Sequence, residues 1–140
     1  MNRLDVIYDD GCPFCVRCVR WLAREPQLVE LRFLAAGSAD TARRYPALDK
    51  LGEEITAVDD EGGVYRGTDA YLVCLYALRR WRHWSHRLSA PAWRPLTRRA
   101  FDLLTRRRKN LSKLLGAATP LESPCAGACP PIVRPASRAP

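Results

Sequence analysis

Three cysteines stand in the segment DDGCPFCVRC, at positions 12, 15 and 18, directly after a short apolar run. That run, LDVIY, is rich in β-branched and aromatic residues and ends at turn-forming aspartates, which predicts a buried first strand. Pro13 follows the first cysteine and suits the first turn of a helix, where a missing N–H is tolerated. The pattern therefore favours an α/β fold that presents thiols where a strand passes into a helix. Three uses remain open: a redox pair, a metal clamp, or packing.

Hydrophobic spacing predicts the remaining elements. The first helix continues from Cys12 until Pro26 stops it. After it we expect a strand at 28–36, a weak helix or irregular loop at 38–52, a β-hairpin at 55–67, an apolar helix at 67–81 with Thr68 as its N-cap, a segment at 86–96 broken by Pro91 and Pro95, and an amphipathic helix at 100–116.

This order of elements is a βαβ unit followed by an antiparallel hairpin and a covering helix, the layout of a thioredoxin-like α/β sheet. A chain of 140 residues is long enough to build its own core without structural metal or disulfides. We predict a thioredoxin-like domain over residues 1–116 that includes an extra C-terminal helical region. Residues 117–140 are rich in proline and alanine without periodicity, which predicts a flexible tail that carries Cys125 and Cys129.

The net charge of +8 rests almost entirely on arginine. Such a charge attracts nucleic acid, anionic membranes or acidic partners, and we expect weak nonspecific anion binding. The sequence shows no secretory signal, and no apolar run is long enough to span a membrane, so we predict no transmembrane segment and a cytoplasmic location. Disulfides in that compartment are mostly transient and catalytic, so the six cysteines need a chemical explanation.

The position of Cys12 predicts reactivity. A thiol at the start of a helix faces unpaired N–H groups and the positive end of the helix dipole, which favour the thiolate. We therefore assign Cys12 as the attacking thiol. Cys15 lies on the same helix face and is assigned as the resolving thiol, which attacks a mixed disulfide on Cys12. Pro13 fixes the helix start and Phe14 offers an apolar surface, so we assign both to substrate contact.

The other polar and thiol residues near these positions have competing interpretations. Asp9 is a candidate catalytic residue that shuttles a proton for Cys15, and it also suits an Asx turn at the corner between strand and helix. Cys74 is predicted to pack in the core. Cys18 is predicted to pack as a small buried residue, with a third redox thiol or an iron-sulfur ligand as the alternatives. Cys125 and Cys129 are possible secondary thiols for exchange. Together with the first pair they also have the composition of a four-thiolate zinc site, although the strand-helix context favours redox chemistry.

The stretch RRWRHWSHRLSAPAWRPLTRR is a second candidate for function. Trp81, Trp84 and Trp93 alternate with arginines, which suits stacking on bases, contact with a membrane surface, or packing of a helical lid on the sheet. We favour the packing interpretation and a solvated surface for His83 and His86. The alternative function is a small basic binding module, for nucleic acid or a membrane surface, whose cysteines are structural or bind zinc.

Three stretches, YDDGCPFCVRCVRWL, VDDEGGVYRGTDA and FDLLTRRRKNLSKLLG, resemble the DCC-type thiol-disulfide oxidoreductase family. The family is named for an Asp-x-x-Cys-x-x-Cys signature, which falls here on Asp9, Cys12 and Cys15. The resemblance covers roughly residues 4–116 and implies a thioredoxin-like fold and dithiol exchange. The Cys-Pro-Phe-Cys core is also similar to glutaredoxin centres.

Two departures affect the predicted site. The family more often has Gly-Asp before the first cysteine, whereas this chain has Asp10-Gly11. Thioredoxins and glutaredoxins usually place a cis-proline before the strand that faces the active site, and no proline stands there in this chain. We assign Ile55 and Thr56 to that place in the substrate groove. The predicted function is exchange of a Cys12–Cys15 dithiol with protein or glutathione-like thiols, without a cofactor or bound metal.

Overall fold

The computed structural model describes residues 1–116, and the statements below concern that part of the chain. The predicted tail at 117–140, with Cys125 and Cys129, lies outside the described residues. The elements follow in the order β1 (Arg3–Tyr8), α1 (Pro13–Arg24), β2 (Glu30–Ala35), α2 (Ala39–Arg44), β3 (Thr56–Asp59), β4 (Val64–Arg66), α3 (Thr68–Ala77), α4 (Arg82–Ser89) and α5 (Arg94–Leu115).

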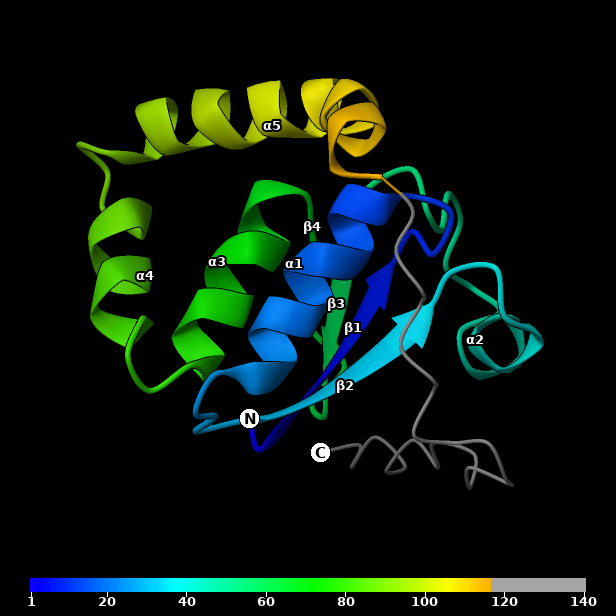
Figure 1. Cartoon of the computed structure of the whole chain (residues 1–140). Coiled ribbons are helices and arrows are strands. Elements are labelled where there is room, and N and C mark those ends of the chain that lie inside the picture. The colour runs from blue at the N-terminus through cyan, green and yellow to red at the C-terminus, as the bar shows by residue number, and fades with distance from the viewer. Residues whose placement is uncertain (117–140) are drawn as a thin grey trace, which may run out of the picture.

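The four strands form one mixed sheet in the order β2-β1-β3-β4 (Figure 1). β1 and β2 are parallel neighbours that α1 connects along the chain. β3 runs antiparallel to both β1 and β4. The hairpin between β3 and β4 turns at 60–63, inside the range 55–67 predicted for it. This topology confirms the predicted thioredoxin-like α/β fold, with β1 buried at the centre of the sheet.

Alternate residues of β1 point to opposite faces of the sheet, as a strand requires. Leu4, Val6 and Tyr8 face α1 and α3 and belong to the larger hydrophobic core, which includes Val16 of α1 and Cys74 of α3. The other face carries a smaller cluster built on Ile7, Leu34 and Val58. The sheet is therefore covered on both faces, as expected for a parallel pair joined by a helix.

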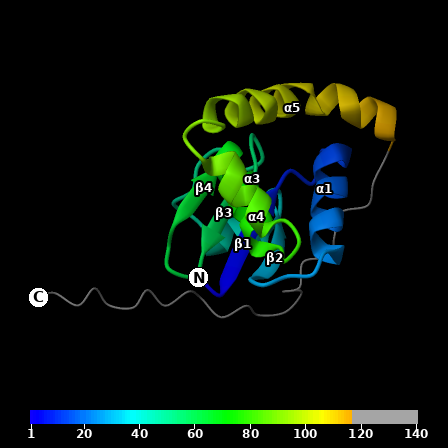
Figure 2. The same cartoon turned by 90° about the vertical axis from the view of Figure 1, so that its left-hand side faces the viewer.

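The last two helices pack on the outside of the α1 and α3 layer. Ser85 of α4 is buried, and its Oγ donates a hydrogen bond of 2.8 Å to the carbonyl of Leu72 in α3. α5 lies across the ends of α3 and α1, as Figure 2 shows. The ring of Phe101 in α5 stacks on that of Tyr71 in α3, with centroids 4.7 Å apart. The ring stack ties α5 to α3, and α5 also packs on α1.

The boundaries of the later helices correct the sequence predictions. Gly67 occupies the N-cap of α3 with a φ of 53°, so the prediction that Thr68 is the N-cap was wrong. A positive φ suits glycine, and the chain turns into the helix one residue earlier. α3 then ends at Ala77 and not at residue 81, because Leu78 takes an extended conformation.

A separate helix, α4, spans Arg82–Ser89 and so includes the first residues of the segment 86–96, which the sequence predicts to be broken by prolines. α5 also begins at Arg94 and not near residue 100. Pro95 lies in the first turn of α5, where its ring meets no carbonyl of a preceding helical turn and its missing N–H would have no helical partner. The sequence predicts a break at Pro95, whereas in the structure this proline lies in the first turn of α5.

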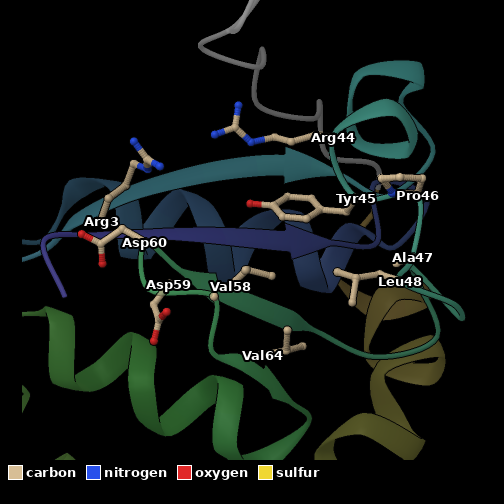
Figure 3. Close-up of a pocket in the computed structure, with 11 residues that line it drawn as sticks. Arg3, Arg44, Tyr45, Pro46, Ala47, Leu48, Val58, Asp59, Asp60 and Val64 are labelled. Atoms are coloured by element: carbon tan, nitrogen blue, oxygen red, sulfur yellow. The ribbon is translucent and has the colours of Figure 1, made fainter. Parts of the chain in front are cut away.

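The face of the sheet opposite α1 holds a cavity of about 380 Å³ (Figure 3). It lies between α2, the loop that follows it and the β3–β4 hairpin. Arg3, Arg44, Tyr45, Val58 and Val64 are among its lining residues. The cavity lies on the α2 side of the sheet, whereas Cys12 and Cys15 belong to the side of α1.

A buried carboxylate anchors α2 and its following loop to this face. Asp5 of β1 is 2% exposed. Its Oδ2 accepts hydrogen bonds from the Tyr45 hydroxyl at 2.6 Å and from Arg44 Nε at 3.0 Å. Arg3 Nε lies 3.6 Å from its other oxygen. A buried charge is tolerated only when it is paired in this way, so the arrangement ties the end of α2 to the central strand.

Replacing Tyr45 with Phe tests this anchor. We expect Tyr45→Phe to lower the free energy of unfolding by about 1.5–3 kcal/mol, because a buried carboxylate loses a donor. Tyr65→Phe is the matched control, since it removes the 3.0 Å hydrogen bond from Tyr65 to Asp59 in the more exposed hairpin. Water replaces that donor, and a loss below about 1 kcal/mol is expected. Urea unfolding measures both, and equal losses would show that Asp5 is not an anchor.

Candidate active site

The chain turns from β1 into α1 through a short corner that places Cys12 at the N-cap of the helix. The backbone N–H of Cys12 donates to the carbonyl of Asp9 at 3.3 Å, and Val16 N–H makes the first helical bond to the Cys12 carbonyl at 3.0 Å. Pro13 is the first helical residue, as predicted. The Cys12 sulfur accepts a hydrogen bond of 3.4 Å from the backbone N–H of Cys15 and so acts as the capping group.

The far end of α5 covers this sulfur. Cys12 is only 5% exposed. Ser112, near the end of α5, places its Oγ 3.4 Å from Cys12 Sγ. The same Oγ accepts a hydrogen bond of 3.3 Å from the backbone N–H of Phe14. The Ser112 hydroxyl thus contacts the Cys12 thiol and also accepts a hydrogen bond from an N–H of the first turn of α1 that has no partner within the helix.

These contacts make the Cys12 thiol more acidic than an ordinary cysteine. Burial raises the pKa of Cys12, but hydrogen bonds from Ser112 and Cys15 and the positive charge of Arg108 outweigh it. The net effect lowers the pKa of Cys12 below its usual value. A lower pKa increases the fraction of thiolate, the nucleophilic form, near neutral pH.

The Cys15 thiol has the opposite property. Cys15 is half-buried, and burial is the largest of the causes that raise its pKa to about 12. The neighbouring Cys12 adds to this increase, and Arg108 opposes it. Nη1 of Arg108 lies 3.7 Å from Cys15 Sγ. Adjacent thiols with opposite pKa shifts provide one group that ionises readily and one that keeps its proton.

Arg108 connects the thiols to two further parts of the chain. Its Nη2 donates hydrogen bonds to the carbonyls of Gly52 and Glu53, at 3.2 and 2.7 Å. Its Nη1 lies 3.7 Å from Oδ2 of Asp9. The other oxygen of Asp9 accepts the Gly11 N–H at 3.0 Å, which is the Asx turn considered for this corner. Asp9 therefore shapes the corner and also faces the guanidinium beside Cys15.

The two other described cysteines lie further into the protein. Cys74 is 1% exposed in the main core, which confirms the prediction that it packs there. Cys18 is half-buried, less than predicted, and burial is the main cause that raises its pKa to about 11. Within residues 1–116, no group of three or more potential metal ligands occurs. The zinc hypothesis also involves Cys125 and Cys129, which lie outside this range.

The predicted substrate-contact residues lie on two elements at one end of the sheet. Pro13 and Phe14 are half-buried in the first turn of α1. Thr56 begins β3 and pairs with Ile7, near the end of β1 that leads into the corner with Cys12. Thr56 is 2% exposed, whereas Ile55 is half-buried against the core. The described chain contains no cis peptide bond, and the roles of these four residues stay predictions.

A family model for DCC1-like thiol-disulfide oxidoreductases matches residues 6–114. The chain belongs to this family. Comparisons with curated proteins and with solved structures gave no match. The family confirms the resemblance noted in the sequence and supports thiol-disulfide oxidoreductase activity in general, and it does not favour the alternative of a basic binding module.

The basic tryptophan-rich stretch of this DCC1-like protein only partly follows the packing prediction. Trp81 meets Trp21 of α1 edge to face, with ring centroids 5.5 Å apart. Trp81, Trp84 and Trp93 are nevertheless all exposed, at 37%, 43% and 57%. His83 and His86 are exposed as predicted. In the described region, no helix combines the length and the hydrophobicity that a membrane span requires.

Sequence reasoning missed Arg108 and Ser112, the two α5 residues that reach the thiols. They stand four residues apart on one helix face, inside the stretch FDLLTRRRKNLSKLLG that carries part of the family resemblance. Three consecutive arginines stand at 106–108, and the sequence alone does not show which of them faces the thiols. In the structure Arg106 and Arg107 are exposed, and Arg108 is half-buried.

The pKa differences predict the order in which the thiols react. With iodoacetamide at pH 6–8, we expect Cys12 to be alkylated first, with a rate midpoint below the ordinary cysteine pKa of about 8.5. Cys15, Cys18 and Cys74 should react slowly, because burial disfavours their thiolates. Peptide mass mapping after timed quenching measures each site, and denatured protein is the control in which the differences should vanish. Labelling of Cys15 ahead of Cys12 would contradict this order.

Proposed function

We propose that this protein is a dithiol oxidoreductase in which Cys12 is the attacking thiol and Cys15 the resolving thiol. The observation that carries the proposal is the opposite pKa shifts of two adjacent thiols at the start of one helix. Family membership supports the reaction class. The substrates we propose are disulfides of proteins or of glutathione-like small thiols, and the reaction takes place in the cytoplasm.

In the first step the Cys12 thiolate attacks one sulfur of a substrate disulfide. A new S–S bond forms between Cys12 and that sulfur, and the substrate S–S bond breaks. The other substrate sulfur leaves with the electron pair as a thiolate and takes a proton from water. The low pKa of Cys12 assists this step because the nucleophile is present before the substrate binds.

In the second step Cys15 loses its proton and its sulfur attacks the Cys12 sulfur. The Cys12–Cys15 bond forms, the mixed disulfide breaks, and the second substrate sulfur leaves as a thiolate that is protonated. We assign proton removal to Asp9, because its carboxylate and the Cys15 sulfur both lie 3.7 Å from Arg108 Nη1. Overall the dithiol loses two electrons and two protons, and the substrate disulfide gains them.

The cycle closes when an external thiol reduces the Cys12–Cys15 disulfide by the reverse sequence. Two equivalents of a glutathione-like thiol supply the two electrons and two protons, so the chemistry needs no further cofactor. We assign substrate contact to Pro13 and Phe14 beside Cys12 and to Ile55 and Thr56 at the start of β3. Support for this assignment comes from their shared place at the end of the sheet where the thiols lie.

A trapping experiment tests the two roles. Cys15→Ser should accumulate a mixed disulfide on Cys12 when treated with glutathione disulfide, because the resolving thiol is gone. Cys12→Ser should form no such adduct at position 15, where the pKa of about 12 keeps the thiol protonated. Cys18→Ser is the matched control and should behave as the wild type. Intact and peptide mass spectrometry measure the adducts.

Two results would overturn the proposal. The first is that Cys15→Ser forms no adduct. The second is that the oxidised wild type contains no Cys12–Cys15 disulfide.

A further inference from the structure

We propose that Ser112 and Arg108 of α5 are positioning residues of the dithiol, acting on successive steps of the exchange. Ser112 donates a hydrogen bond to the Cys12 thiolate, and Arg108 stabilises the Cys15 thiolate that forms during resolution. This inference rests on the proposed function, since it assigns how each sulfur charge of that reaction is held. Neither residue exchanges electrons itself.

The Ser112 hydroxyl has one hydrogen and three neighbours. It donates to the carbonyl of Arg108 at 2.7 Å and accepts the N–H of Phe14 at 3.3 Å, while Cys12 Sγ lies at 3.4 Å. A protonated Cys12 can donate its own S–H to the hydroxyl. A thiolate has no hydrogen to give, so the contact becomes a hydrogen bond only when Ser112 turns its hydrogen from Arg108 to the sulfur.

This change in direction leaves no buried group unpaired. The carbonyl of Arg108 lies inside α5, where a regular helix supplies the backbone N–H of residue 112 as its partner. The hydroxyl bond to that carbonyl is an additional bond, of a kind that contributes little to helix stability. Giving it up for a bond to a charged sulfur is favourable, because hydrogen bonds to ions are the stronger ones.

Arg108 is held in place by groups that do not react. Its Nη2 bonds to the carbonyls of Gly52 and Glu53, and its side chain is only 12% exposed. That fixed half of the guanidinium leaves Nη1 directed at Cys15 and Asp9. An arginine stays charged at every relevant pH, so this charge is present in each step.

The positive charge acts on whichever sulfur is ionised. Before the reaction, the charge of Arg108 favours the Cys12 thiolate. Once Cys12 has entered the mixed disulfide, its negative charge is gone, and the Cys15 thiolate becomes the nearest anion that forms. Among residues 1–116, the neighbouring groups that titrate or carry charge include Asp9 in the corner before α1, Cys18 in α1, Tyr71 in α3 and Arg108 in α5.

The Ser112 half of the inference is tested by the pH profile of Cys12 alkylation. Ser112→Ala should raise the midpoint by about one pH unit, the shift expected when a hydrogen bond to an ion is lost. Ser112→Thr keeps the hydroxyl and should restore a midpoint close to that of the wild type. A structural defect at position 112 would change the Cys12 midpoint in both Ser112→Ala and Ser112→Thr. Loss of the hydroxyl alone should raise it only in Ser112→Ala. An unchanged midpoint in Ser112→Ala overturns this half.

The Arg108 half is tested by the resolution step. Wild type and variants are converted to the Cys12 mixed disulfide with 5,5′-dithiobis(2-nitrobenzoate), and release of the coloured thiolate by Cys15 is followed over pH 6–9. Arg108→Gln should slow release about tenfold at neutral pH, as expected if the Cys15 pKa rises by one unit. Arg108→Lys keeps the charge and should recover part of the rate. Arg107→Gln, the exposed neighbour, is the matched control and should react like the wild type.

Failure of this inference is distinct from failure of the proposed function. If the wild type forms no Cys12–Cys15 disulfide and releases no coloured thiolate, the proposed function fails and the inference fails with it. If the wild type resolves normally and Arg108→Gln matches Arg107→Gln, the reaction stands and the role of Arg108 is wrong. Equal slowing in both arginine variants also refutes that role, because it shows an effect of net charge alone.

Discussion

The guanidinium of Arg108 joins parts of the chain that are far apart in sequence. It contacts the Asp9 corner after β1, the Cys15 thiol in α1, and the carbonyls of Gly52 and Glu53 before β3. The arginine comes from α5, so the placement of this helix determines the geometry around both sulfurs. The C-terminal helical region is therefore part of the dithiol centre, and not an addition to a complete thioredoxin-like sheet.

The sequence predicted the part of the site that forms through local interactions. The corner, the helix start and the positions of the two thiols depend on residues within one segment: turn-forming aspartates, Pro13 directly after Cys12, and apolar residues at helical spacing. The later helices were less predictable, because Pro95 is compatible with the end of one helix and with the start of another. Contacts made in the folded chain decide between the two, among them the stacking of Phe101 in α5 on Tyr71 and the ion pair of Arg94 with Asp69.

The sequence alone could not predict which residues of α5 face the thiols, for a physical reason. A helix with arginines at 106, 107 and 108 has three candidate inward residues, and its rotation is set by the stacking of Phe101 and by the core beneath it. The same limit applies to the tryptophans. Trp81 contacts Trp21 of α1, whereas Trp84 contacts His83 of its own helix, and the sequence does not distinguish the two.

Ser112 lies three residues before the end of α5, in the last helical turn. The ends of helices open locally at a much lower free-energy cost than the unfolding of the whole protein. Cys12 is only 5% exposed beneath this turn, so the end of α5 restricts the space in which a disulfide can approach its sulfur. The same helical turn therefore supplies a polar partner for the sulfur and limits which disulfides fit beside it.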